Sequence, residues 1–168
     1  MKSHLLFWVM FLVIVLPYYG KAANPATTSL TGLYGDTIDV VHYAIHLTNI
    51  NVTQKSLQGY TDVTFTPLMN GISALPLELI SLSADSVIIN DVSVTGYSHQ
   101  GTLLRIPLPQ VMNVNDTATV RIYYHGTPFT DPSNWGGVHF SGEYVFNLGV
   151  GFDANPHNLG KTWFPCID

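Results

Sequence analysis

Charged residues and cysteine are scarce in this sequence. Only 10% of its 168 residues are Asp, Glu, Lys or Arg, and the net charge is −5 at pH 7. No run of basic residues occurs, so the electrostatic footprint of a nucleic-acid-binding protein is missing. The single cysteine, Cys166, excludes an internal disulfide framework and a zinc site built from several cysteines.

The motifs of self-sufficient hydrolases are also missing. None of the seven histidines is followed directly by Glu, which excludes the His-Glu-x-x-His signature of zinc proteases. No Gly-x-Ser-x-Gly elbow occurs, which excludes the α/β-hydrolase arrangement. His42 and His46 lie in a strand-like pattern, about 13 Å apart along one face, and cannot share a metal ion. Cys166 follows Trp-Phe-Pro, a setting that favours core packing over a catalytic pair with His157.

A long apolar run is present at the N-terminus. Residues 5–16 (LLFWVMFLVIVL) follow Lys2, and Gly20-Lys21-Ala22 offers small residues for a cleavage site. Twelve residues make about 18 Å of helix, well short of the ~30 Å hydrocarbon core of a membrane. We therefore expect residues 1–22 to be a signal peptide of an exported protein, periplasmic or extracellular. A membrane anchor formed by residues 5–16 is the alternative, and residues 23–36 are expected to be a leader before one domain at 37–168.

From residue 38 onward, apolar residues alternate with a period of two, which is typical of β-strands. Strands are expected at 39–47, 57–66, 75–79, 82–89, 92–94, 103–108, 116–124, 138–140 and 144–148. Asn90 and Asp91 predict a hairpin turn, and Pro107 predicts that its strand lies near a sheet edge. No substantial helix is expected after the signal peptide. The predicted fold class is all-β, either an antiparallel saddle-like curved sheet or a β-sandwich.

The alternation also predicts which side chains share a face. In the first strand these are Val41, Tyr43, Ile45 and Leu47. In the second they are Leu57, Gly59, Thr61, Val63 and Phe65, and in the strand at 116–124 they are Ala118, Val120, Ile122 and Tyr124. Two Asn-x-Thr sequons, at Asn51 and Asn115, fall at predicted turns and would accept glycans only in a eukaryotic secretory route.

Six segments follow one another in a characteristic order. They are DVVHYAIHL, LQGYTDVTF, LSADSVIINDVSV, VRIYYHGTP, WGGVHF and KTWFPCID. Over roughly residues 38–168, this order resembles the N-terminal domain of the zinc aminopeptidases related to aminopeptidase N. The resemblance implies a saddle-shaped β-domain packed against a thermolysin-like domain that carries His-Glu-x-x-His and a Gly-x-Met-x-Asn loop. Neither of these two motifs is in this sequence.

The resemblance further implies an enzyme that removes N-terminal residues from peptides with zinc as its cofactor. This chain would be its non-catalytic domain, which shapes the substrate cleft and alone binds no zinc and hydrolyses nothing. Residues 163–166 would be interior packing that the zinc-bearing domain covers. The alternative is a stand-alone secreted β-sandwich used for binding or adhesion.

One substrate-binding role can be carried over by position. In related enzymes the N-terminal domain lends a Gln or Glu to the pocket for the substrate's amine, about a dozen residues before the Asp that corresponds to Asp168. Pro156 occupies that position here. Asn155 and His157, which flank it, are therefore the substrate-binding candidates that the resemblance implies.

Overall fold

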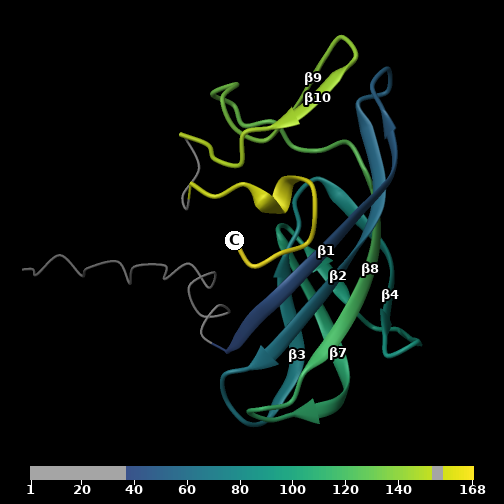
Figure 1. The fold of residues 1–168 in the computed structure, drawn as a ribbon, viewed down its shortest axis with the longest axis vertical. Coiled ribbons are helices and arrows are strands. Elements are labelled where there is room, and N and C mark those ends of the chain that lie inside the picture. The colour runs from purple at the N-terminus through teal and green to yellow at the C-terminus, as the bar shows by residue number, and fades with distance from the viewer. Residues whose placement is uncertain (1–36, 153–156) are drawn as a thin grey trace, which may run out of the picture.

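Ten antiparallel strands make up most of the described chain. The structure is a computed structural model that describes residues 37–152 and 157–168 (Figure 1). The strands are β1 (Ile38–Asn51), β2 (Ser56–Pro67), β3 (Ile72–Glu78), β4 (Leu82–Ile89), β5 (Val92–Val94), β6 (Ser98–Gln100), β7 (Leu103–Met112), β8 (Ala118–Gly126), β9 (Val138–Ser141) and β10 (Tyr144–Asn147). Within this part of the chain the one helical element is a short 3-10 turn, η1 (Gly160–Thr162). The predicted all-β antiparallel fold class is confirmed.

The predicted signal peptide (1–22) and leader (23–36) lie outside the described residues. Among the residues that are described, no helix has the length and apolar character needed to cross a membrane.

The strands form three sheets. Their orders are β1-β2-β8-β4-β5, β3-β7-β6 and β10-β9. One hydrophobic cluster joins buried side chains of the two larger sheets: Leu57, Val63 and Phe65 on β2, Val87 on β4, Val120, Ile122 and Tyr124 on β8, Leu75 and Leu77 on β3, and Leu104 and Ile106 on β7. Each such side chain contributes roughly 1.5–3 kcal/mol when it is fully buried. This shared core fixes the two sheets against one another.

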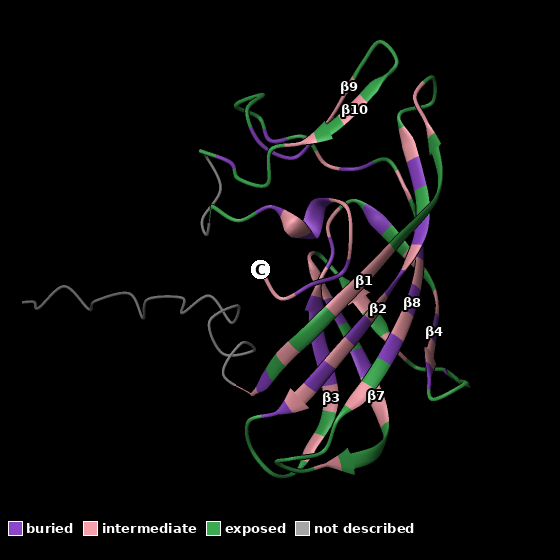
Figure 2. Ribbon diagram, in the orientation of Figure 1, coloured by how far each residue is buried: buried purple, intermediate pink, exposed green. Residues whose placement is uncertain are grey.

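Alternation predicts the buried faces of β2 and β8 correctly. Every second residue from Leu57 to Phe65 is buried, and Val120, Ile122 and Tyr124 are buried on β8 (Figure 2). The predicted face of β1 is partly wrong, because a β-bulge between Val40 and His42 shifts the register. Val41 is consequently 60% exposed, while Val40 packs against the core.

The β4–β5 hairpin is present as predicted. Asn90 and Asp91 both have positive φ, 48° and 63°, which is the geometry of a tight hairpin turn. The prediction that Pro107 places its strand near an edge is wrong for the strand as a whole, because β7 is the middle strand of its sheet. However, residues 108–111 have no register partner in β3 or β6. Pro109 therefore removes an N–H where no ladder bond is required.

Candidate functional site

The C-terminal segment crosses the molecule and attaches to β3 and β1. Glu78 and Cys166 form an isolated antiparallel bridge, and the N–H of Ile80 donates to the carbonyl of Lys161 at 2.9 Å. The N–H of Ile167 donates to the Tyr43 hydroxyl at 2.9 Å. The Phe164 ring meets the Tyr43 ring edge-on at a centroid distance of 5.4 Å. These contacts give residues 160–168 a fixed position in spite of their short secondary structure.

The aromatic residues of this segment are only partly covered by the described chain. Pro165 and Cys166 are buried, whereas Trp163 and Phe164 are half-buried against the core. The expectation that another domain covers residues 163–166 is therefore wrong for Pro165 and Cys166, which the chain itself buries, while Trp163 and Phe164 keep uncovered surface. Trp163 also lines an apolar cavity of about 320 Å³, together with Leu47 and Phe146.

A buried group of three charges lies beneath the segment. The Lys161 Nζ lies 3.4 Å from Glu78 Oε2 and 3.7 Å from Asp168 Oδ2, and all three side chains are at least 88% buried. Two carboxylates therefore share one ammonium in a region where unpaired charge is costly. The group links β3, η1 and the last residue of the segment.

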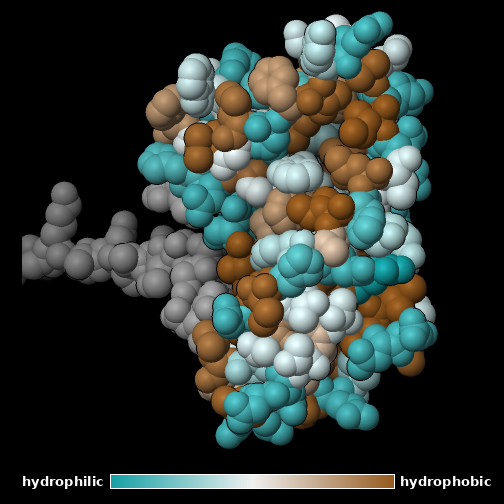
Figure 3. All heavy atoms as spheres, in the orientation of Figure 1, coloured by the Kyte–Doolittle hydropathy of each residue, from teal (hydrophilic) through white to brown (hydrophobic). Residues whose placement is uncertain are grey.

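A surface patch of exposed apolar residues surrounds β10. We define the β10 patch as Trp135, Tyr144, Phe146, Leu148, Val150 and Phe152, whose exposed fractions lie between 44% and 77%. Trp135 and Phe152 pack ring to ring at 5.7 Å, although they lie in different loops. In Figure 3, hydrophobic residues lie among hydrophilic ones over this upper part of the molecule. Several exposed large apolar side chains near one strand are typical of a face that contacts another protein surface.

The predicted substrate-binding residues are placed unequally. Asn155 lies outside the described residues. His157 is described, and its Nδ1 lies 2.9 Å from the carbonyl oxygen of Gly151. The N–H of Gly151 in turn donates to the carbonyl of His157 at 2.9 Å. His157 thus sits at the base of the loop that carries Phe152 of the β10 patch.

Cys166 is not arranged as a nucleophile. Its side chain is buried, and this burial, helped by the nearby carboxylates of Asp168 and Glu78, raises the pKa of the thiol far above its usual value. No contact joins it to His157 within the described part of the chain. The neutral, enclosed thiol fits the core role that the sequence predicts.

The histidines of β1 are surface residues without a shared centre. His46 stacks on the Tyr60 ring at a centroid distance of 4.5 Å, and His42 is exposed. Across residues 37–152 and 157–168, no three His, Cys, Asp or Glu side chains are grouped closely enough to hold a metal ion. The residues described here therefore do not fit a zinc-ligand set.

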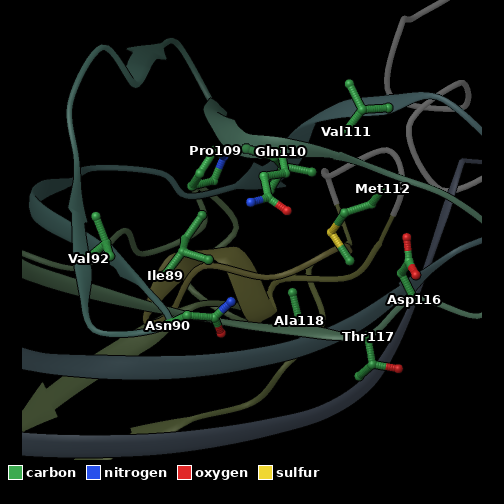
Figure 4. A pocket seen from close by; sticks show the side chains of 11 residues that line it. Ile89, Asn90, Val92, Pro109, Gln110, Val111, Met112, Asp116, Thr117 and Ala118 are labelled. Carbon is green, nitrogen blue, oxygen red and sulfur yellow. The ribbon is translucent and has the colours of Figure 1, made fainter.

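A second cavity of about 430 Å³ opens beside the β4–β5 turn (Figure 4). Ile89, Met112 and Ala118 give it an apolar floor, and the amides of Asn90 and Gln110 stand at its sides. The carboxylate of Asp116 at its rim already accepts the N–H of Asn113 at 2.7 Å. Its lining contains no acid–base pair, so it offers no evident chemistry.

No family model matches the sequence, and no curated protein matches it. Solved structures do match. An M1 zinc metallopeptidase mutant from Deinococcus radiodurans, bound to a Tyr-Ser-Ala substrate, is 24% identical, with a TM-score of 0.66 over 79% of this chain and 29% of that chain. A two-domain M1 zinc metallopeptidase mutant bound to L-arginine is 22% identical, with a TM-score of 0.67 and the same coverage. Yeast LTA4 hydrolase in complex with bestatin is 19% identical, with a TM-score of 0.56 over 80% of this chain and 21% of the hydrolase.

These similarities establish the fold. At such identities a match carries architecture and not a list of functional residues. The chain spans 29% of the length of the M1 zinc metallopeptidases that it matches. The described residues thus have the fold of a part of the M1 zinc metallopeptidases, and the resemblance predicted from six sequence segments is confirmed at the level of the fold.

Proposed function

We propose that this chain is the non-catalytic N-terminal domain of an exported zinc aminopeptidase that removes N-terminal residues from peptides. The observation that carries the proposal is the fold match to M1 zinc metallopeptidases, one of which is bound to a tripeptide substrate. The six sequence segments support the same assignment independently of the coordinates. In this role the chain contributes shape and contact surface, and the chemistry belongs to a second domain.

The β10 patch is the surface that the zinc-bearing domain would cover. Its exposed aromatic rings would each gain about 25 cal/mol for every Å² removed from water, which favours docking of an apolar face. The half-buried Trp163 extends the same region through the cavity that it shares with Phe146. Covering the patch would also bring His157 to the wall of the substrate cleft, and Asn155 stays the second candidate from its place in the sequence.

Zinc would be held by residues outside this sequence. The described residues offer no ligand set, and His-Glu-x-x-His is absent from the sequence. The proposed tasks of this chain are therefore to bind its partner domain, to limit the cleft and to orient the peptide's amine through Asn155 or His157.

Reading the gene beyond codon 168 is the first test. An open frame that continues into Glu-Pro and later into His-Glu-x-x-His supports the proposal. A stop codon supports the stand-alone binding or adhesion module instead. The protein of the complete reading frame should bind zinc and release N-terminal residues from alanine p-nitroanilide, whereas the 168-residue chain alone should do neither.

A paired substitution tests the docking face in that complete protein. Tyr144→Ser with Phe146→Ser should reduce kcat/KM at least tenfold and separate the unfolding of the two domains in calorimetry. Val92→Ser with Val111→Ser, which changes two similarly exposed residues beside the other cavity, should leave both quantities unchanged. Equal effects of the two pairs would contradict the proposed docking face.

Export is tested separately. Residues 1–22 fused to a reporter should direct it out of the cytoplasm and be removed, leaving a reporter that begins at residue 23. Retention of the reporter in membranes with residues 5–16 still attached would favour the anchor instead.

A further inference from the structure

A β-bulge in β4 turns an acidic side chain toward β8. Ala84 faces Tyr124 and Ser86 faces Tyr123, so Asp85 is the extra residue between them. The Tyr97 hydroxyl, in the loop between β5 and β6, donates to the carbonyl of Asp85 at 3.0 Å. This hydrogen bond stabilises the backbone of the bulge. Bulges are frequent beside functional sites, because they re-aim one side chain out of the regular pattern.

Asp85 holds His125 in one orientation. The His125 Nδ1 lies 2.7 Å from Asp85 Oδ1 and 2.9 Å from Oδ2. Because a carboxylate accepts, Nδ1 carries the hydrogen and donates it. The Nε2 atom then faces outward on a side chain that is 57% exposed, and it has no hydrogen-bond partner within the described chain. The bulge therefore presents a pre-oriented polar atom to solvent.

A cavity of about 490 Å³ lies in front of this pair, at the end of the sheet where β1 turns into β2. Its lining adds neutral hydrogen-bonding side chains from both strands and from the turn between them: Asn49, Gln54, Ser56 and Gln58. No Lys or Arg lines it, and Asp85 is its single carboxylate. The cavity thus combines several donors and acceptors with almost no net charge.

A catalytic reading of the same residues is not supported. Ser56, His125 and Asp85 share the cavity, as a Ser-His-Asp triad would. However, no hydrogen bond joins the Ser56 hydroxyl to His125 among the described residues. The site is therefore suited to binding and not to nucleophilic attack.

Aromatic side chains continue from the cavity along the same face of the sheet. Gln58 pairs with His125, and two residues further along β2, Tyr60 pairs with Tyr123. Residues two apart on a strand share a face and lie about 7 Å from one another. The Tyr60 and Tyr123 rings lie 5.3 Å apart between centroids, so an aromatic pair follows next along the sheet, outside the residues that line the cavity.

We infer that this cavity binds a neutral polyhydroxylated ligand, namely a mono- or disaccharide. Each sugar hydroxyl both donates and accepts, and so does each amide side chain of Gln54, Gln58 and Asn49. His125 Nε2 accepts a hydrogen bond from a sugar hydroxyl, and Leu57 is the apolar side chain that the lining offers to a sugar ring. Asp85 disfavours anions, and the lone carboxylate does not make a site for a multivalent cation.

The test uses the whole chain and ¹H–¹⁵N NMR titrations with glucose, maltose, N-acetylglucosamine and, as the anionic comparison, inorganic phosphate. At least one saccharide should give saturable shifts at the side-chain amides of Gln54 and Gln58, with a Kd on the order of 1 mM. His125→Ala and Gln58→Ala should each weaken binding about tenfold. His42→Ala, which removes an exposed histidine elsewhere on the same sheet, should leave binding unchanged.

Circular dichroism of each variant checks that its fold is retained. If His125→Ala does not fold, Asp85→Asn takes its place, and this variant should also weaken saccharide binding because His125 loses the carboxylate that orients it. The inference is overturned by the absence of saturable shifts with every saccharide, by shifts with phosphate alone, or by equal binding in His125→Ala and the unaltered chain. The readout needs no peptidase domain, so it succeeds or fails independently of the proposed aminopeptidase role.

Discussion

Glu78 and Cys166 hold one another through both of their backbone groups. The N–H of Glu78 donates to the carbonyl of Cys166 at 2.6 Å, and the N–H of Cys166 donates back to Glu78 at 3.0 Å. This bridge makes β3 the support for a segment that lies at the other end of the sequence. The side chains add a second link, because the Glu78 carboxylate forms an ion pair with Lys161 of that segment.

Lys161→Met is expected to destabilise the protein by about 3 kcal/mol, because it leaves the carboxylates of Glu78 and Asp168 buried without their cation. Urea unfolding followed by tryptophan fluorescence measures this change. Adding Glu78→Gln should restore part of the loss, since one of the two buried charges is then removed. Lys55→Met, at an exposed turn, should change the free energy of unfolding by less than about 0.5 kcal/mol. A loss that is equally small for Lys161→Met would contradict this account of the charge group.

The Cys166 thiol should resist alkylation in the folded protein. Burial keeps it from the reagent, and the raised pKa of the thiol keeps it protonated, whereas the thiolate is the reactive form. Iodoacetamide labelling followed by mass spectrometry should show almost no modification in buffer and full modification in urea. A Ser83→Cys variant provides an exposed thiol on the same chain and should be labelled in both conditions. Rapid labelling of Cys166 in buffer would mean that the C-terminal segment opens.

Tyr124 should make the protein sensitive to alkaline pH. Burial raises the pKa of Tyr124 to about 12 from an ordinary 10.0, and burial does the same for Tyr43. Because the folded state holds these protons more tightly, the stabilisation is complete below pH 10 and is lost as the pH rises toward 12. Free energies of unfolding measured across this range should fall with pH, and Tyr124→Phe should make the fall shallower.

The same substitution has a cost at neutral pH. Tyr124→Phe leaves the buried Thr61 hydroxyl without its partner at 3.2 Å, which should destabilise the protein by about 1–2 kcal/mol. An unchanged alkaline slope in this variant would assign the pH sensitivity to other groups.

Gly59→Ala should destabilise the protein by about 2 kcal/mol or more. A Cβ at this position would lie only 2.3 Å from the carbonyl oxygen of His46, so β1 would have to move away from β2. Thermal and urea unfolding measure the loss. Ser93→Ala, on the exposed edge strand β5, is the control and should have little effect. A neutral result at Gly59 would show that β1 is free to shift.

The alternation of apolar and polar residues predicts the buried residues of a strand well where one face of that strand is buried and the other faces solvent. β2 meets this condition along its whole length, which is why its buried residues from Leu57 to Phe65 follow the pattern. β1 does not, since its bulge reverses the expected exposure of Val41. The three residues of β6 are too few to show a period, and that strand was not predicted.

The two surfaces to which we assign proposed roles were less predictable. Neither Asp85 nor His125 belongs to a local sequence motif, and only the strand register together with the bulge brings the two side chains together. Tyr144 and Phe146 look like ordinary core-forming residues in the sequence, because exposure depends on which sheet covers a strand. The family resemblance predicted the fold, but it could not place these side chains.

The stretch of β7 between Pro107 and Met112 has a consequence for self-association. An extended backbone without a neighbouring strand is a template onto which another molecule can add its own strand. Pro109 deprives residues 108–111 of one amide donor, so an incoming strand would lack a hydrogen-bond partner for one of its carbonyls there. Pro109 therefore disfavours the addition of a second molecule's strand along residues 108–111 of β7.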